Sequence, residues 1–598
     1  MKKYFLLLLL LLNSGYYAQG IKFFLLTNPA EAAKNRLLPP DSIKSAISRF
    51  APDAPVVCSG NLTAKGTINE LYRGKMYLDS VSSNIFFLPG KNDLGQNISS
   101  VFNISRVFGR EGFIADFGTT VLYGLQAIST SDNTRPHISY ETQKRINEDA
   151  PSFRGKKIIL FINAQPEEIS NFERAAGAFS GCEVSILFTP DFALKKKKEP
   201  ARRRIQKPEE LDYLHAFEIR NDSAIIYSYS SDNNFTRSEI RLAGKVDLNS
   251  LAERKLPGEA KPLLDLKKSI FAGMLRYKEN IHIGAADGTV SCYSPDYKSK
   301  WTQELTGTIA SAPIISEGNL IAASAKGDII ILNPADKSEV QSIGIDCEIV
   351  SPLTVIDYKG KKELLIPKST SSTKALVFGG SNGEVLCYDI ETLQQFWINS
   401  DSKSPILQNV IDASNKLIFK NGEGYIICLD SRTGQLIWKW NYRDIFADTE
   451  SRIYNTGKQI VTLTTANTIA GIDLLLGVAE WESEKGGIKD ILILDGDRNT
   501  IIAIADKKII FFNSRTGKFK SEIKIKEKNI ISFLIPEGYQ GEPLLLSSDN
   551  RIFRLEKSKT LKAAGFAGSA PVISSAQSGK NEILILNSDG QLLKTTLK

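Results

Sequence analysis

The stretch NGEGYIICLDSRTGQLIW, residues 421–438, decides how the second half of this chain folds. A glycine turn precedes a short apolar run, a second turn ends at Gly434, and the next run ends in Trp438. Short apolar runs between glycine turns are typical of β-hairpins, because glycine readily adopts the positive φ that tight turns need. The stretch therefore predicts two neighbouring strands of one small antiparallel sheet.

The same pattern recurs along the rest of the chain. Its eight copies are centred on Gly288, Gly327, Gly383, Gly424, Thr468, Lys507, Asn550 and Gly590. They are spaced about 43 residues apart, which is the length of one four-stranded propeller blade. We expect an all-β, eight-bladed propeller over residues 266–598, with seven blades as the alternative. The last copy ends after its third strand, so the closing blade is expected to take a strand from residues 263–270.

The repeats also resemble a known family. LDSRTGQLIW at 429–438 and the partial copy NSRTG at 513–517 are similar to the AxDxxTGxxxW repeat of quinoprotein-like (PQQ-repeat) propellers. That family includes quinone-dependent alcohol dehydrogenases and the propeller subunit of the outer-membrane barrel-assembly machinery. The resemblance implies that four tryptophans dock adjacent blades: Trp301, Trp397, Trp438 and Trp481. The dehydrogenases use vicinal cysteines and a calcium-binding carboxylate cluster, which these repeats lack, so we expect no quinone and no other cofactor.

The first half has a different periodicity. Apolar runs at 21–26, 55–58, 85–88, 121–128, 157–162 and 184–188 predict strands, and the segments 42–50, 70–81, 140–147 and 167–179 predict helices. Runs without polar alternation suit sheets that are buried on both faces. We therefore expect a layered α/β domain over residues 19–250 that ends in strands within 211–246, followed by a proline- and glycine-containing linker at 251–265.

This first half resembles the calcineurin-like metallophosphoesterases. GNLTAKGT at 60–67 and PGKND at 89–93 are similar to the GDLTxxG and PGNHD motifs of that family, and both follow apolar strands. The resemblance implies that the family's metal-ligand and catalytic positions correspond here to Asn28, Ala30, Asn61, Lys91, Asn92, Asn163, Thr189 and Asp191.

Those residues do not suit a pair of metal ions. Two divalent ions need several carboxylates and neutral imidazoles to offset their charge, and an ammonium such as Lys91 would repel them. The sequence therefore predicts a pseudoenzyme with no metal site and no catalytic residue. Two alternatives remain open: an anion sensor at Lys91, or a residual phosphoesterase that uses Asp93 and Asp191 as a carboxylate pair. The only histidines, His137, His215 and His282, are expected to be surface or packing residues.

The first residues predict export. Lys2 and Lys3 precede an apolar run over 4–12 and a small residue at Ala18, which is the pattern of a secretory signal over residues 1–18. An uncleaved anchor is the alternative. No later apolar run approaches the length of a membrane span. We expect a location in the periplasm or at the inner face of the outer membrane of a Gram-negative-type bacterium.

Charge and cysteine spacing limit the partners. The formal net charge of +8 is partly concentrated in residues 195–207, which predict a solvated loop able to contact lipid phosphate, and nucleic acid is not an expected partner. The six cysteines show no CxxC spacing, which excludes a zinc ribbon or covalent haem, while pairing of Cys58 with Cys182 stays open. The hypothesis is a non-catalytic envelope scaffold whose propeller docks a partner protein or an outer-membrane complex. The pseudo-phosphoesterase domain would be a second binding surface.

Overall fold

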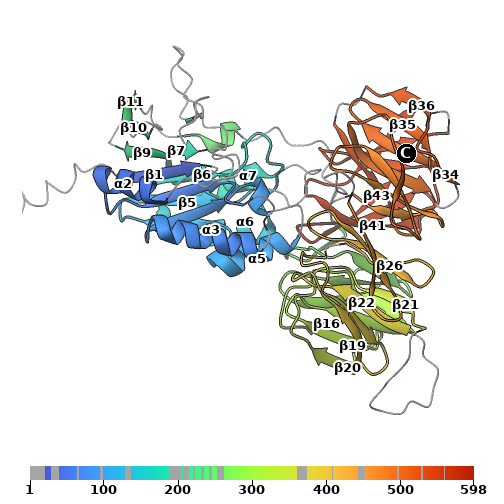
Figure 1. Ribbon diagram of the computed structural model, residues 1–598. Helices are drawn as coiled ribbons and strands as arrows, with labels where there is room; N and C mark the ends of the chain where they lie inside the picture. The colour runs from blue at the N-terminus through green and yellow to red at the C-terminus, as the bar shows by residue number, and fades with distance from the viewer. Residues whose placement is uncertain are drawn as a thin grey trace, which may run out of the picture.

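The computed structural model describes residues 21–27, 40–63, 66, 68–94, 98–127, 136–188, 204–205, 214–219, 223–229, 235–241, 246–251, 262–359, 374–406, 408–441, 451–494, 497–526, 529–557 and 559–598. Figure 1 shows a layered α/β domain in blue and green beside a ring of small sheets that runs from green to red. In the described part of the chain, no helix is long and apolar enough to cross a membrane.

The amino-terminal domain contains two mixed sheets. The first has the order β11-β10-β9-β1-β2-β3, in which β1, β2 and β3 are parallel. Its strands are β1 (Ile21–Thr27), β2 (Val56–Gly60), β3 (Ile85–Pro89), β9 (Leu214–Ile219), β10 (Ser223–Tyr229) and β11 (Phe235–Arg241). The second has the order β4-β5-β6-β7-β8, with β5 to β8 parallel. Its strands are β4 (Phe113–Asp116), β5 (Thr120–Leu125), β6 (Lys157–Ile162), β7 (Glu183–Phe188) and β8 (Arg204–Ile205).

The two sheets pack face to face between helices, as Figure 1 shows. Phe23 and Leu25 of β1 point into the core between the sheets, whereas Phe24 and Leu26 point to the helical layer. Helices α2 (Pro40–Phe50) and α3 (Ile68–Val81) cover the first sheet, and α6 (Tyr140–Asp149) and α7 (Phe172–Ala178) cover the second. Both faces of each central strand are therefore buried, which explains why the apolar runs show no polar alternation.

The structure also contains elements that the sequence pattern did not predict. These are α4 (Lys91–Leu94), α5 (Ile98–Phe108), β4, β8, and the 3-10 helices η1 (Ala150–Phe153) and η2 (Leu248–Leu251). β8 lies inside residues 195–207, which were predicted to be a solvated loop, and it pairs with β7. Two predicted elements are shorter than expected. The helix predicted from 167 begins at Phe172, and the strand predicted to 128 ends at Leu125.

The second domain is an eight-bladed propeller, so the seven-bladed alternative is wrong. Blade 1 comprises β13 (Met274–Tyr277), β14 (Asn280–Gly284), β15 (Thr289–Tyr293) and β16 (Ser299–Glu304). Blade 2 comprises β17 (Ile314–Ser316), β18 (Asn319–Ala323), β19 (Asp328–Leu332) and β20 (Glu339–Gly344). Blade 3 comprises β21 (Thr354–Asp357), β22 (Lys374–Gly379), β23 (Val385–Asp389) and β24 (Gln395–Asn399).

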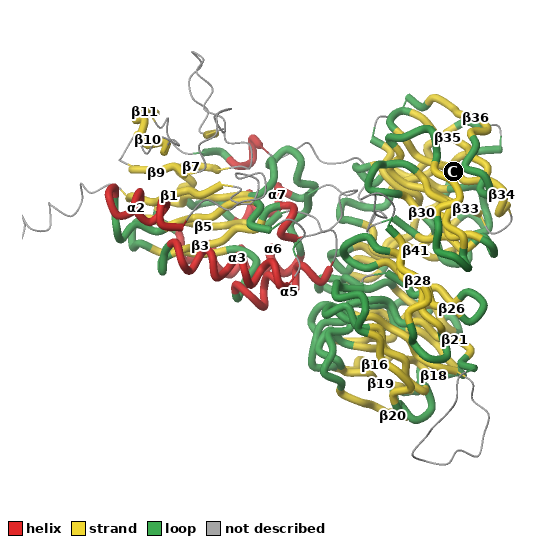
Figure 2. The backbone as a smooth tube through the Cα atoms, in the orientation of Figure 1, coloured by secondary structure: helices red, strands yellow, loops and turns green. Residues whose placement is uncertain are grey.

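The next four blades repeat this pattern. Blade 4 comprises β25 (Ile411–Asp412), β26 (Lys416–Lys420), β27 (Ile426–Asp430) and β28 (Leu436–Trp440), and blade 5 comprises β29 (Ile453–Asn455), β30 (Gln459–Leu463), β31 (Ile469–Asp473) and β32 (Ala479–Glu482). Blade 6 comprises β33 (Ile488–Leu494), β34 (Asp497–Ala505), β35 (Lys508–Asn513) and β36 (Phe519–Lys524). Blade 7 comprises β37 (Ile530–Leu534), β38 (Leu544–Ser547), β39 (Arg551–Leu555) and β40 (Leu561–Phe566). Figure 2 shows these strands arranged around the ring.

Blade 8 closes the ring with strands from both ends of the propeller. It consists of β12 (Leu264–Asp265), β43 (Gln591–Thr596), β42 (Glu582–Asn587) and β41 (Val572–Gly579). Leu264 pairs with Leu592, and the backbone N–H of Leu263 donates to the Leu592 carbonyl at 2.8 Å. The expectation that the closing blade borrows a strand from residues 263–270 is confirmed.

Candidate functional site

The predicted site positions lie at the carboxyl ends of parallel strands. Asn61 follows β2, Lys91 follows β3 by two residues, and Asn163 follows β6 directly. Parallel strands present their carboxyl ends at one edge of a sheet, which is where ligands of open α/β sheets bind. The other predicted positions, Asn28, Ala30, Thr189 and Asp191, lie outside the described residues.

Asp93 is the centre of the described part of this site. Its side chain is fully buried, and its Oδ1 accepts hydrogen bonds from the Leu62 N–H at 2.8 Å, the Thr63 N–H at 2.7 Å and the Thr63 hydroxyl at 2.9 Å. Its Oδ2 accepts from the Gly90 N–H at 2.8 Å. The carboxylate therefore joins the loop after β2 to the loop after β3.

Two asparagines extend this network. The Asn61 Oδ1 accepts from the Asn92 N–H at 2.8 Å, and a Cβ at Gly90 would lie only 2.5 Å from that oxygen, so glycine is required there. The Asn163 Oδ1 accepts from the Ala127 N–H at 2.7 Å, and its amide group donates to the Pro89 carbonyl at 2.8 Å. Because Ala127 follows β5 and Pro89 ends β3, Asn163 joins the two sheets.

The hydrogen bonds limit the chemistry that these residues can perform. A carboxylate offers about four lone-pair sites, and Asp93 accepts four hydrogen bonds from the surrounding loops. Burial raises the pKa of Asp93 to about 7, against the lowering effect of the bonds from Gly90, Thr63 and Leu62. Three of these bonds converge on Oδ1 and one reaches Oδ2, and the whole side chain is buried, so a metal ion would have to open the surrounding loops to reach Asp93. The geometry suits a structural crosslink.

Lys91 has a different position from its neighbours. It is the first residue of α4 and its side chain is exposed, whereas Asp93 two residues later is buried. The structure therefore brings together Asn61, the Asn92 backbone, Asp93 and Asn163, while the Lys91 side chain points to the surface.

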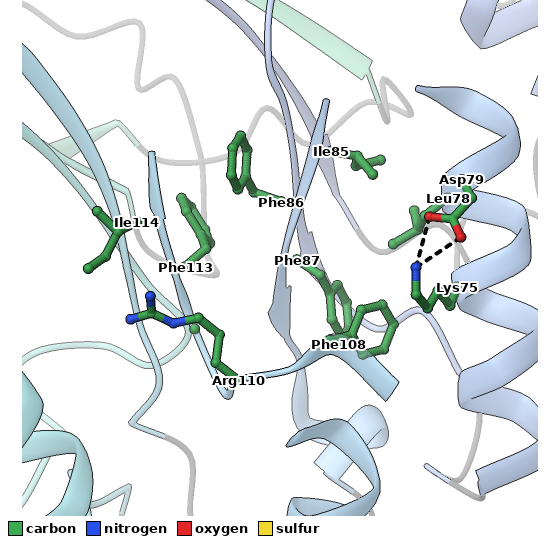
Figure 3. Close-up of a pocket in the computed structure, with 11 residues that line it drawn as sticks. Lys75, Leu78, Asp79, Ile85, Phe86, Phe87, Phe108, Arg110, Phe113 and Ile114 are labelled. Atoms are coloured by element: carbon green, nitrogen blue, oxygen red, sulfur yellow. Dashed lines mark hydrogen bonds and ion pairs between the residues drawn. The ribbon is translucent and has the colours of Figure 1, made fainter. Parts of the chain in front are cut away.

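A cavity of about 220 Å³ lies in the same domain but at the opposite end of β3. Figure 3 shows the rings of Phe86, Phe87, Phe108 and Phe113 around it, with the Lys75–Asp79 ion pair on one side and Arg110 on the other. Because Ile85 and Phe86 begin β3, this cavity is remote from Asn61 and Asp93, which follow the carboxyl ends of β2 and β3. Its lining contains no serine, cysteine or histidine, and its carboxylate, Asp79, is paired with Lys75.

The four tryptophans singled out in the repeats lie on the fourth strands of their blades. Three of them donate an indole hydrogen bond to a carbonyl in the next blade: Trp301 to Pro334 at 3.1 Å, Trp397 to Ser431 at 3.2 Å and Trp438 to Leu474 at 3.2 Å. Trp481 donates within its own blade, to Gln459 Oε1 at 3.3 Å, and its ring lies against Gly517 of the next blade.

Three cysteines face these tryptophans across the sheet. Cys292, Cys387 and Cys428 pair directly with Trp301, Trp397 and Trp438. A small, polarizable side chain leaves room for a large ring and makes favourable contacts with it. In the amino-terminal domain, Cys182 donates its thiol hydrogen to the Ala150 carbonyl at 3.4 Å, and no disulfide joins it to Cys58.

The sequence analysis missed a buried polar joint between the two domains. The Asp589 carboxylate, in the turn between β42 and β43, accepts from His137 Nε2 at 2.8 Å and pairs with Arg174 at 3.0 Å. His137 Nδ1 contacts the Ser170 hydroxyl at 2.7 Å. His137 is therefore a polar contact across the domain boundary, not only a packing residue. Its partner lies 452 positions away, so no local pattern could have identified it.

Two further contacts cross the same boundary. The Glu141 N–H, in the first turn of α6, donates to the Ser269 hydroxyl at 3.3 Å. Arg106 of α5 forms an ion pair with Glu348, between blades 2 and 3. The amino-terminal domain thus contacts blade 8, the segment that enters blade 1, and the loop after blade 2. Figure 1 shows α5 and α7 facing the propeller.

Comparisons with known proteins agree with the propeller. Residues 381–586 match the family model described as outer membrane protein assembly factor BamB. Solved structures that match the chain include BamB from Moraxella catarrhalis, at 13% identity and a TM-score of 0.43, with 57% of this chain and 99% of that one covered. The computationally designed protein Ika8 has 16% identity and a TM-score of 0.45, covering 57% and 99%.

Sqt1 from Saccharomyces cerevisiae has 12% identity and a TM-score of 0.42, covering 56% and 98%. No curated protein matches the chain. The family-model match lies wholly within the propeller. The carboxyl-terminal half of the chain is an eight-bladed propeller with a BamB-like domain at residues 381–586.

Proposed function

We propose that this protein is a non-catalytic scaffold of the cell envelope whose propeller, residues 266–598, docks a partner protein or an outer-membrane complex. The observation that carries the proposal is the match of residues 381–586 to the BamB family model, within a closed ring of eight blades. That family is described as an outer membrane protein assembly factor. A propeller exposes loops and strand edges on a rigid frame, which suits protein binding.

The amino-terminal domain, residues 19–250, is proposed to be a pseudo-phosphoesterase that offers a second binding surface. Its support is the position of Asn61, Lys91 and Asn163 after the carboxyl ends of strands, together with the four hydrogen bonds that Asp93 accepts from the protein. In this proposal, hydrogen bonds between loops have taken over the structural part of a metal centre. The chemistry of a metal-bound water has no counterpart there.

The proposed location is the periplasm or the inner face of the outer membrane, reached through a signal over residues 1–18. The basic start, the short apolar run and Ala18 support export, and the BamB-like domain supports an envelope location. Residues 251–265 are proposed as the linker between the two domains, although the last two of them, Leu264 and Asp265, form β12 and belong to blade 8. Residues 195–207 are proposed to touch lipid phosphate through their basic side chains.

The test is isolation of the tagged full-length chain from gently solubilised envelopes, with mass spectrometry of whatever remains bound in stoichiometric amount. The expected result is a reproducible complex that contains outer-membrane or periplasmic proteins. A chain that purifies alone, and that hydrolyses a phosphate ester when loaded with a divalent metal, would overturn both the scaffold proposal and the loss of catalysis.

A further inference from the structure

The turns between third and fourth strands provide an internal comparison within the propeller. In blades 4 and 6 these turns read DSRTG at 430–434 and NSRTG at 513–517, whereas blade 5 has DLLLG at 473–477. Leu475 and Leu476 therefore replace the Arg-Thr pair of the other two turns. These two residues are 67% and 69% exposed, the highest values among the large apolar residues that the structure describes in the propeller.

The fold does not require these leucines. In blade 5 the Asp473 side chain accepts from the Leu475 and Leu476 N–H groups at 2.8 and 2.7 Å, and the Gly477 N–H donates to the Asp473 carbonyl at 2.9 Å. The turn at 513–517 makes the equivalent bonds through its asparagine and glycine. The first and last residues of each turn thus fix its geometry, and the middle positions are free to be polar.

The fourth strand of blade 4 shows a similar departure. The two residues before the docking tryptophan are Ser299 and Lys300 in β16, Gln395 and Phe396 in β24, and Ala479 and Glu480 in β32. In β28 they are Leu436 and Ile437, which are 42% and 43% exposed. This is the only one of the four strands in which both positions carry large aliphatic side chains.

The leucine-rich turn of blade 5 and the strand β28 of blade 4 are in contact. The Trp438 indole of β28 donates to the Leu474 carbonyl, and a Cβ at Gly477 would lie 2.4 Å from the Trp438 ring. The turn of blade 5 therefore packs directly on β28. Trp438 faces blade 5, so Ile437 and Lys439, its neighbours along β28, face the other side of the sheet, toward blade 3. A strand added to the edge of β28 would meet both sides. We call the exposed aliphatic side chains of β28 and of the blade-5 turn the apolar rim patch: Leu436, Ile437, Leu475, Leu476 and Val478.

The backbone of β28 narrows the choice of ligand. β28 is the last strand in the order β25-β26-β27-β28, so its outer edge has no strand partner among the described residues. A lipid surface could cover the leucines, but it would leave the edge N–H and C=O groups without partners, at a cost of several kcal/mol each. An added strand pairs with those groups and also buries the aliphatic side chains.

Charge adds a further requirement. Lys439 of β28 is exposed beside the patch, and its ammonium lies 3.8 Å from the centre of the Tyr425 ring. Lys458, also exposed, is fixed beside the turn because its carbonyl accepts from the Leu474 N–H at 2.9 Å. The described residues supply neither lysine with an ion-pair partner. A partner segment with a carboxylate would complement them.

We propose that the apolar rim patch binds an extended segment of a partner protein, which pairs with the outer edge of β28 and carries aliphatic side chains and at least one carboxylate. This inference rests on the proposed scaffold function and names the surface and the chemistry of its partner. It is separate from the face that contacts the amino-terminal domain.

The test uses a fluorescein-labelled synthetic peptide in which valine and leucine alternate with threonine and glutamate, added to the full-length protein. We expect saturable binding by fluorescence anisotropy and protection of the β28 amides, Leu436–Trp440, from hydrogen exchange. The double variant Leu475→Asp, Leu476→Asp should weaken binding at least about tenfold, as loss of a central apolar anchor does. The matched control in the next blade, Arg515→Asp with Thr516→Asp, should bind like the unchanged protein.

A second form of the probe requires no change to the protein. N-methylation of alternate peptide amides removes the donors for strand pairing but retains the side chains, so it should abolish binding. The proposal is wrong if the methylated peptide binds equally well, or if the aspartate pair leaves binding unchanged. It is also wrong if the patch instead mediates self-association or binding to phosphatidylglycerol vesicles, either of which the aspartate pair would abolish.

The proposed function and this inference can fail separately. If the unchanged chain retains no envelope partner, the scaffold proposal fails. If the unchanged chain and the Leu475→Asp, Leu476→Asp variant retain the same partner equally, the scaffold proposal holds and the apolar rim patch is excluded as its docking surface.

Discussion

Two of the buried carboxylates in the described residues have contrasting surroundings: Asp93 among the loops of the amino-terminal domain and Asp589 at the joint between the domains. Both are almost inaccessible, at 0% and 3% exposure, yet their surroundings differ. Asp93 accepts hydrogen bonds from neutral groups only, and burial raises its pKa to about 7. Burial also acts to raise the pKa of Asp589, but His137 and Arg174 outweigh it and hold that pKa below its ordinary value.

The difference shows how each region is held together. Asp93 joins loops of a single domain through neutral donors, so added salt should affect these hydrogen bonds little, although the carboxyl group itself titrates with a pKa of about 7. Asp589 joins two domains through an ion pair with Arg174 and a hydrogen bond from His137, and an ion pair is weakened by salt screening. Added salt should therefore weaken the joint more than the network around Asp93.

The largest effect is expected from removing the carboxylate at the joint. Asp589→Ala leaves Arg174 and His137 without their partner, and breaking a buried charged pair costs about 3–5 kcal/mol. Chemical denaturation would measure this loss in the free energy of unfolding, and small-angle X-ray scattering would report whether the domains separate. The matched control is Asp549→Ala, at the equivalent turn of blade 7, where the side chain pairs only with neighbouring Ser547 and Arg551. An equal loss in both variants would contradict a special role for the joint.

A smaller effect is expected at the loop network. Asp93→Ala removes the acceptor of three backbone N–H groups and should destabilise the amino-terminal domain by about 1–3 kcal/mol. Denaturation followed by a probe in that domain would measure it. Asp79→Ala, which removes an exposed ion pair with Lys75, serves as the control and should change stability by less than about 0.5 kcal/mol. If Asp93→Ala leaves the free energy of unfolding unchanged, water has replaced the carboxylate as the acceptor of these hydrogen bonds.

The pH dependence of stability should distinguish the two carboxylates by sign. The pKa of Asp93 rises from 3.8 to about 7 on folding, so the folded state binds more protons between about pH 4 and 7. Its contribution to stability therefore falls as pH rises through that window, by up to about 1.4 kcal/mol per unit.

Asp589 behaves in the opposite way. Its pKa is lowered on folding, so its contribution is present above about pH 4 and is lost as pH falls through the folded value. Denaturation at stepped pH, comparing the unchanged chain with Asp93→Asn and Asp589→Asn, separates the two. Asp93→Asn should abolish only the fall in the free energy of unfolding as pH rises from about 4 to 7, and Asp589→Asn only the fall at acidic pH. The assignment is wrong if either variant removes the pH dependence assigned to the other residue.

The smallest effect is expected from added ligands at the old site. Because the acceptor sites of Asp93 are occupied by the protein, neither manganese, zinc nor inorganic phosphate should change the melting temperature of the amino-terminal domain. A ligand at a hundred times its dissociation constant would add about 2.7 kcal/mol, which scanning fluorimetry detects easily. A phosphate-dependent increase that disappears in Lys91→Ala would favour an anion sensor over a closed site.

The sequence predicted the propeller well because the signals are local. A glycine turn such as that at Gly434 and a tryptophan such as Trp438 lie within a few residues of one another and recur in other blades. The same locality explains the misses. α5 was not predicted because no capping or spacing pattern identified it, and β4 is only four residues long.

The candidate site was predictable as a set of positions but not as a set of contacts. The motifs place Asn61 and Asp93 after neighbouring strands, which the structure shows. That Asp93 would bind the backbone of residues 62 and 63 depends on how two separate loops fold together. The contact between the domains was even less predictable. His137 and Asp589 have no distinctive pattern around them in the sequence, and they meet only in the folded chain.

The strand that β12 contributes to blade 8 has a consequence for how the protein is made. Synthesis produces β12 directly before blade 1, but its partner β43 follows only after blades 1 to 7. Until β43 is made, β12 has no strand to pair with, the ring stays open and the hairpin of β41 and β42 lacks its neighbour. Folding of the propeller is therefore tied to a strand pairing that spans the whole domain, and closure is its slow, non-local step.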